Sequence, residues 1–310
     1  MHFWTTAPEK RRGEMLLMTT AVLHGLFPIL VHAGTHVLPP LYFSAICLLI
    51  GAGCSFLMLL GQKHFLLCVL KASQLRDVVV VTFLNLIIPI ALIAEGTRLT
   101  SGINTALLLQ AEILFTFIVC NVLLRQKTHA LRLLGALSVF LGTLLILLQG
   151  SYTLNRGDLS IVLATAFYPF GNLISKRLVA SLDVLTIIFL RSLIAGLLLL
   201  GFSAILEDVP MAISVTLMRA WWLVGLQGFF VFFLSKYLWY EGLKVLSVPR
   251  AVFIVSSAPA WSLLFAVVFL HEIPDMAQLI GFGITLIGVF LLTAHFPRKM
   301  PPVSALRPTV

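Results

Sequence analysis

The fold can be predicted from one segment of the chain, because the chain contains a second version of it. This segment is residues 95–145, EGTRLTSGINTALLLQAEILFTFIVCNVLLRQKTHALRLLGALSVFLGTLL. Shifted by 146 positions, it aligns without gaps on residues 241–291, with nine identities in 51 positions. Leucines match by chance in so apolar a sequence, but two glycines also recur with the same spacing of seven. These are Gly135 with Gly281 and Gly142 with Gly288. The pattern predicts an internal duplication with two copies of about 150 residues each.

The composition places the chain in a lipid bilayer. Hydrophobic residues make up 60% of the sequence and charged residues 11%, whereas a soluble domain carries roughly 25% charged residues. Apolar runs of about 20 residues, each long enough to cross the bilayer as a helix, occur throughout the chain. The formal net charge of +9 is therefore interpreted through its distribution over the loops, and no nucleic-acid partner is expected.

Ten membrane-spanning helices fit the pattern of apolar runs and breaks. They are expected at 15–33, 39–60, 77–95, 102–124, 131–149, 158–178, 184–206, 220–242, 250–270 and 276–294. Pro39-Pro40 marks the start of the second helix, and Asp158 is placed to cap the sixth. The expected organisation is a first repeat at 1–150, a second at 151–296, and a disordered cytoplasmic tail at 297–310.

The positive charges fit one orientation of these ten spans. With a cytoplasmic N-terminus, only Arg98, Arg156 and Arg219 of the 21 lysines and arginines lie on the opposite side. Arg191 and Lys236 lie within spans, and the remaining 16 are cytoplasmic. This asymmetry predicts cytoplasmic N- and C-termini and a multi-pass protein of the cell (inner or plasma) membrane.

The number of spans fixes the relation between the copies. Five spans per copy is an odd number, so the second copy enters the membrane upside down relative to the first. Inverted-topology repeats are typical of secondary transporters, which bind their substrates near the bilayer midplane between the halves. The predicted fold class is thus all-α integral membrane, with ten transmembrane helices in two inverted five-helix repeats.

Glu112 lies at the centre of the expected fourth span. A carboxylate at this depth costs roughly 2.5 kcal/mol or more on insertion scales unless it is paired, protonated or hydrated. Thr105 and Thr116 would share its face on a continuous helix. The residue is interpreted as a cavity group that binds a substrate amine or a proton. The alternative is a protonated glutamate that hydrogen-bonds to a neighbouring helix.

Two further spans carry polar side chains at helical spacing. In the sixth span, Tyr168 and Asn172 lie on one face with Thr165 and Lys176, which predicts either a cavity wall or polar contacts between helices. In the eighth span, Lys236 precedes Tyr240 by one turn. Lys236 is interpreted either as a cationic site for an anionic substrate or as a lysine that reaches the lipid headgroups.

Arg191 lies at a similar depth in the seventh span. Its position favours the interpretation that the guanidinium reaches the lipid headgroups.

Prolines interrupt four of the spans, and polar residues lie near two of them. The prolines are Pro28, Pro89, Pro169 and Pro259. Each removes a backbone donor and frees a carbonyl that a cavity or a neighbouring helix must satisfy. Asn85 lies one turn before Pro89, and Ser256-Ser257 precede Pro259. The pattern predicts bent helices around a polar midplane space, or kinks that serve packing alone.

The remaining residue types give no sign of catalysis or metal binding. His32 and His36 have the i, i+4 spacing of metal ligands, and His24 lies two turns earlier, but no third ligand accompanies them. The four cysteines include no CxxC pair and are interpreted as small buried residues. No nucleophile elbow, phosphate loop or aspartate pair is found. Neither an enzyme nor a cofactor is expected.

Several motifs resemble the EamA-like family of the drug/metabolite transporter superfamily. Gly157-Asp158-Leu159 resembles the start of a second EamA repeat. Ala258-Pro259, the segment 270–274 (LHEIP) and the two glycines of the second copy resemble its closing signature. The resemblance implies ten spans in two inverted repeats. It also implies export of amino acids, other metabolites or toxic compounds, while some relatives move nucleotide sugars or sugar phosphates.

The chain departs from the family pattern at several places, and one of them is Cys47, near where the second span often has an arginine. His24-Gly25 stands where many relatives have Trp-Gly, and Gln126 stands where the second half keeps Glu272. Glu112 is followed by Ile113 where members often have Glu-Pro. These departures concern the central cavity, to which His24 is assigned as a candidate residue.

The sequence favours a secondary transporter that exports a small, amino acid-like or drug-like solute by alternating access. Protons are the expected coupling ion, exchanged at Glu112. The expected partners are the solute and the bilayer, and a homodimer is left open. Two other classes stay open. One is an intramembrane enzyme or a translocator of nucleotide sugars, sugar phosphates or lipid-linked sugars, and the other is a membrane scaffold or sensor without transport. The complete set of cavity candidates is Glu112, Thr105, Thr116, His24, Asn85, Tyr168, Asn172, Lys236, Tyr240, Ser256 and Ser257.

Overall fold

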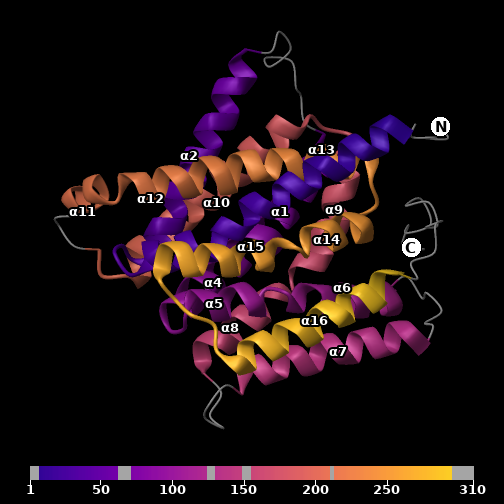
Figure 1. Cartoon of the computed structure of the whole chain (residues 1–310). Coiled ribbons are helices and arrows are strands. Elements are labelled where there is room, and N and C mark those ends of the chain that lie inside the picture. Colours follow the sequence, from indigo (N-terminus) through magenta and orange to yellow (C-terminus); the bar gives the residue numbers. More distant parts are fainter. Residues whose placement is uncertain (1–6, 62–70, 124–129, 149–154, 210–212, 295–310) are drawn as a thin grey trace.

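The protein is a bundle of long helices (Figure 1), described here from a computed structural model. The structure describes residues 7–61, 71–123, 130–148, 155–209 and 213–294. No strand occurs within these ranges. The predicted tail at 297–310 lies outside them.

The first half contains five spans, of which the third and fourth are each built from more than one segment. In chain order the elements are α1 (Ala7–Thr35), α2 (Pro40–Leu60), α3 (Ala72–Thr82), the π-helical η2 (Phe83–Ile87), α4 (Ile88–Arg98), α5 (Gly102–Leu108), α6 (Ala111–Leu123) and α7 (Ala130–Leu147). Segments α3, η2 and α4 form one continuous span, and α5 and α6 form the next.

The second half repeats this organisation. Its elements are α8 (Arg156–Thr165), α9 (Tyr168–Leu178), α10 (Val184–Leu206), α11 (Ile213–Arg219), α12 (Trp221–Leu226), the π-helical η3 (Gln227–Ser235), α13 (Lys236–Val245), α14 (Val248–Val255), α15 (Ala258–Phe265), the π-helical η4 (Ala266–Leu270) and α16 (Met276–Ala294). Across the described ranges, nine helices are long and apolar enough to cross a membrane, and Met276–Leu292 adds a shorter apolar one. The ten predicted spans are confirmed. The short helix α11 was not predicted.

The breaks inside the spans recur at equivalent positions of the two halves. Shifting η2 by 146 positions places it at 229–233, inside η3. The same shift places the break between α5 and α6 within one residue of the break between α14 and α15. π-helical segments inside α-helices are found mostly at functional sites. The duplication therefore extends to local departures from regular helix.

The paired glycines bring α7 and α16 into close contact, with the two helices side by side in Figure 1. A Cβ added to Gly135 would lie 2.7 Å from the carbonyl oxygen of Gly288, and one added to Gly142 would lie 2.6 Å from that of Gly281. The first glycine of one helix thus faces the second of the other. The equivalent helices run antiparallel, as inverted repeats require, and the predicted inverted fold is confirmed.

The equivalent helices α2 and α10 are also antiparallel. Glu207 follows the last residue of α10, and its carboxylate accepts hydrogen bonds from the backbone N–H groups of Leu41 (2.7 Å) and Tyr42 (3.0 Å) in the first turn of α2. A carboxylate at a helix N-terminus satisfies donors that have no partner within the helix. This cap joins the end of α10 in the second half to the beginning of α2 in the first half.

Large apolar side chains cover the outside of the bundle. Leu137 of α7, Ile205 of α10 and Ile287 of α16 are at least half exposed. Exposed apolar surface of this extent marks contact with lipid in a protein that spans the membrane.

Candidate functional site

A cavity of about 140 Å³ lies at the junction of the two halves. Eight of its lining positions in the first half have their partner, 146 residues later, in the same lining. The pairs are Asn85 with Val231, Leu86 with Phe232, Ile90 with Lys236, Ala106 with Val252, Leu109 with Val255, Gln110 with Ser256, Glu112 with Ala258 and Ile113 with Pro259. The cavity therefore lies where the inverted repeats face each other, and the breaks in both halves border it.

A chain of amides holds the carboxylate of Glu112. Asn172 donates from Nδ2 to Oε1 of Glu112 over 2.9 Å, and Asn85 donates from Nδ2 to Oδ1 of Asn172 over 3.0 Å. A Cβ on Gly171 would overlap the Asn85 side chain, so only glycine leaves room for this arrangement. Glu112 also lies in the first turn of α6, where the positive end of the helix dipole favours a carboxylate.

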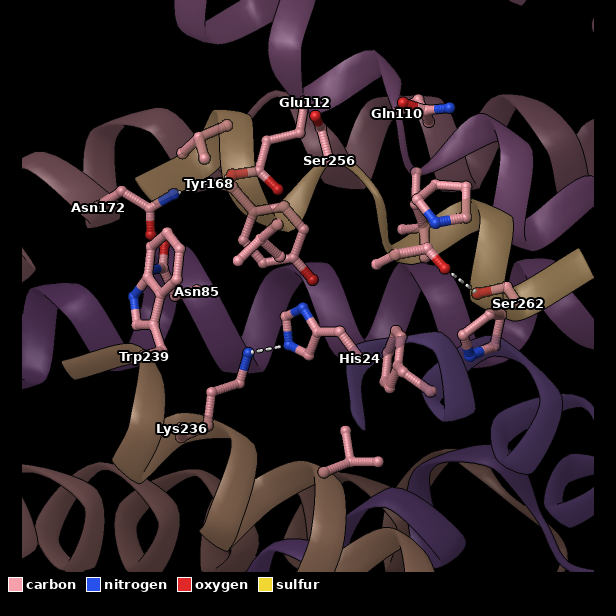
Figure 2. Close-up of a pocket in the computed structure, with 18 of the residues that line it drawn as sticks. His24, Asn85, Gln110, Glu112, Tyr168, Asn172, Lys236, Trp239, Ser256 and Ser262 are labelled. Atoms are coloured by element: carbon pink, nitrogen blue, oxygen red, sulfur yellow. Dashed lines mark hydrogen bonds between the residues drawn. The ribbon is translucent and has the colours of Figure 1, made fainter. Parts of the chain in front are cut away.

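Two cationic side chains enter the cavity from the second half. Lys236 begins α13, directly after η3, and its Nζ lies 2.7 Å from Nε2 of His24 in α1. Arg191 of α10 is 4% exposed, donates to the hydroxyl of Tyr240, and lies 5.4 Å from the centre of that ring. Figure 2 shows Glu112 and Lys236 entering from opposite sides, with Tyr168 between them in this view. These positions contradict the interpretation that Lys236 and Arg191 reach the headgroups.

Seven of the eleven predicted cavity residues line the cavity: His24, Asn85, Glu112, Tyr168, Asn172, Lys236 and Ser256. The other four do not. Thr105 donates to the carbonyl of Ser101 and shares a hydrogen bond with the hydroxyl of Thr97. Thr116 is buried, Tyr240 accepts a hydrogen bond from Arg191, and Ser257 donates to the carbonyl of Ile254. The break after Leu108 explains Thr105, because a common face with Glu112 required an uninterrupted helix.

Three polar lining residues were missed by the sequence reasoning. Gln110 is buried, and within the described ranges its amide has no hydrogen-bond partner. Ser262 donates to the carbonyl of Gly25 over 2.9 Å, across a contact where a Cβ on that glycine would meet Trp261. Arg191 was the third. Their common signal is a polar residue within an apolar span, which also identified Glu112.

The described residues include no group of three histidine, cysteine, aspartate or glutamate side chains that could hold a metal ion. His32 and His36 instead make an edge-to-face contact, with ring centres 4.5 Å apart.

A carboxylate joins the two halves at the end of the bundle where α4 ends and α5 begins. The Glu272 oxygens accept from the backbone N–H groups of Gly102 (3.1 Å) and Ile103 (2.9 Å), at the start of α5. His32 approaches the same carboxylate, with 3.6 Å between Nε2 and Oε1. The position equivalent to Ile103 in the second half is Pro249, which has no N–H. The pair of backbone N–H donors that holds the carboxylate in this Glu272 clasp therefore does not recur at the equivalent positions of the second half.

We expect Glu272→Gln to lower the stability of the protein by about 1–2 kcal/mol. The amide that replaces one oxygen places a donor against a backbone N–H, so a hydrogen bond with a charged partner is lost. Thermal melting of the purified protein measures the change. Glu95→Gln is the control, because Glu95 forms an exposed pair with Arg98 at the same end. Equal melting temperatures for the two variants would contradict the role of the clasp.

Comparison with known proteins agrees with the architecture. Residues 11–148 and 155–294 each match the EamA-like transporter family. The chain is 22% identical over 287 residues to the "Uncharacterized transporter YoaV" of Bacillus subtilis (strain 168), covering 91% of this chain and 97% of that protein. It is 25% identical over 242 residues to the "Uncharacterized transporter YyaM" of the same strain, covering 75% and 78%.

A solved structure titled "Crystal structure of protein" shares the fold. Its TM-score is 0.68 at 17% sequence identity, and the match covers 91% of this chain and 96% of that one. The inverted halves, the cavity between them and the family matches across both halves lead to one conclusion. The chain is a multi-pass membrane transporter that belongs to the EamA-like transporter family.

Proposed function

We propose that the protein is a secondary active transporter that exports a small organic solute by alternating access, with the solute bound in the central cavity. The observation that carries this proposal is the lining, in which equivalent positions of two inverted repeats face one space. Exchanging the conformations of the two halves would open such a space first to one side and then to the other.

Matching contacts at the two ends of the bundle support this mechanism. At one end, Nδ1 of His32 lies 3.3 Å from the carbonyl oxygen of Thr97. At the other, Lys176 donates to the carbonyl oxygens of Leu243 and Leu246. Thr97 and Leu243 are 146 positions apart, so the last turns of the first and sixth spans are held at equivalent carbonyls. We propose that these contacts close the pathway at opposite ends.

Glu112 is the proposed site of proton exchange. It is the one carboxylate among the described lining residues, and its oxygen is already held by a neutral amide rather than by a cation. The groups that face it across the cavity are Lys236, Arg191, His24 and Tyr168. A proton that binds at Glu112 removes the charge of the carboxylate, and a bound solute can change the group with which this carboxylate interacts. Because both events act on the same carboxylate, binding of the proton and binding of the solute are linked.

The positive charges of the loops support an orientation with both termini in the cytoplasm of a cell membrane. In this orientation the Glu272 clasp lies on the outer side and Lys176 on the inner side.

The direct test is solute exchange in proteoliposomes that contain the purified protein. Amino acids, sugar phosphates and cationic drugs are offered in turn, and counterflow is compared with that of protein-free liposomes. We expect at least one class of solute to be exchanged. We also expect the net flux of that solute to depend on the proton gradient. A folded protein that exchanges no solute of any class would contradict transport and favour a scaffold or sensor.

A further inference from the structure

The charges of the cavity do not balance. Arg191 and Lys236 face a single carboxylate, Glu112, among the described lining residues. None of the ion pairs within 4.0 Å that the described residues form involves any of these three side chains. An uncompensated charge in a membrane interior is costly and is retained where function requires it. The excess positive charge therefore needs an explanation beyond folding.

The contacts of the two cations leave donors unused. Lys236 has three N–H donors, and its one described partner is the neutral ring of His24. Arg191 has five, and among the described residues its one hydrogen-bond partner is the hydroxyl of Tyr240, whose ring it also faces. Tyr240 follows Lys236 by one helical turn on α13, and Arg191 and Lys236 line the same cavity of about 140 Å³. Two cations that line one cavity of this size can share one bidentate anion.

The duplication shows that Lys236 is not part of the common framework. Its equivalent in the first half is Ile90, which lines the same cavity. The features that the two repeats share recur in both halves; examples are the glycine contacts and the breaks within the spans. An apolar residue therefore satisfies the fold at this position, and the ammonium group is an addition specific to one side of the cavity.

We propose that the transported solute carries a carboxylate, which binds between Lys236 and Arg191, with a compact apolar body against Phe27 and Trp239. This inference rests on the proposed function only in taking the bound compound to be the transported solute; the inference itself concerns binding. A cavity of about 140 Å³ has roughly the volume of an engineered one of about 150 Å³ that takes benzene. The class is thus small organic carboxylates, with or without an amine that could reach Glu112.

The test is calorimetric titration of the purified full-length protein with three compounds of one ring each. Benzoate carries the carboxylate alone, phenylglycine carries both charges, and benzylamine carries the amine alone. We expect benzoate and phenylglycine to bind at least tenfold more tightly than benzylamine. Absence of benzoate binding, or equal or tighter binding of benzylamine, would overturn the proposal.

Variants of Lys236 connect this binding to the residue. Lys236→Met removes the charge at nearly constant length and should weaken benzoate binding at least tenfold, whereas Lys236→Arg should stay within about threefold of the original protein. Lys244→Gln is the matched control, because Lys244 lies on the same helix and pairs with Glu241 outside the cavity.

Without ligand, Lys236→Met should melt no lower than the original protein, since it loses an uncompensated buried charge. A lower melting temperature with unchanged benzoate affinity would assign Lys236 a structural role instead.

The outcomes separate this inference from the proposed function. Solute exchange in proteoliposomes by a protein that binds only benzylamine would leave the transporter in place and remove the carboxylate class. Benzoate binding that depends on Lys236, in a protein that exchanges no solute, would retain the site and remove transport.

Discussion

Replacing Glu112 with glutamine is expected to lower the initial rate of proton-driven transport at least tenfold and to flatten its dependence on pH. Glutamine keeps the size of the side chain and an oxygen that can accept the 2.9 Å hydrogen bond from Asn172, so the amide chain and the fold should survive. It cannot release or bind a proton in the accessible pH range. Counterflow of a solute against itself, which needs no gradient, should fall less than net flux.

Glu241→Gln serves as the control for this prediction. Glu241 pairs with Lys244 at the surface, and exposed pairs of this kind contribute little to stability. Its variant should transport as the original protein does. A Glu112→Gln protein with unchanged rate and unchanged pH dependence would remove the proposed coupling mechanism, although the cavity could still carry solute.

Gly288→Leu is expected to cause the largest loss of stability of any change proposed here. A Cβ at this position would lie 2.7 Å from the carbonyl oxygen of Gly135 and 2.7 Å from the backbone nitrogen of Val139. Backbone atoms cannot rotate aside, so α7 and α16 must separate along their contact. Overpacking of a well-packed core costs about 1–3 kcal/mol or more, and a contact between backbones lies at the upper end.

The matched control for this change lies on the same helix. A Cβ on Gly283 meets nothing within 4 Å, so Gly283→Leu adds the same side chain toward open space. Thermal melting and the yield of monodisperse protein compare the two variants. If Gly288→Leu melted at the same temperature as Gly283→Leu, the close antiparallel contact of α7 and α16 would be contradicted.

The fold could be predicted from the sequence because its causes are repeated in it. Apolar runs predicted the spans, and the recurrent glycines indicated the duplication; that these glycines bring α7 and α16 together is a finding of the structure. The odd number of spans per copy gave the inversion. These features depend on residue type and spacing alone, which one sequence records directly.

The site could be predicted only in its individual residues. Glu112 and Asn172 were identified because polar side chains are costly in apolar spans. The contacts between cavity residues could not be predicted, because they join residues far apart in the sequence. His24 and Lys236, for example, are 212 positions apart. The break at Leu109 and Gln110 contains neither proline nor glycine, so a continuous helix was assumed in the fourth span, and π-helical segments have no simple sequence pattern.

The central claim, that one cavity between the inverted halves opens alternately to both sides, is tested most directly by labelling a cavity cysteine. Ser256→Cys is placed in a protein whose four native cysteines are replaced, and a membrane-impermeant thiol reagent is added to right-side-out or inside-out vesicles. Leu264→Cys, on the exposed outer face of the same span, is the control and should not react from either side because lipid covers it. We expect the cysteine at position 256 to react from both sides; reaction from one side only, or from neither, would contradict alternating access.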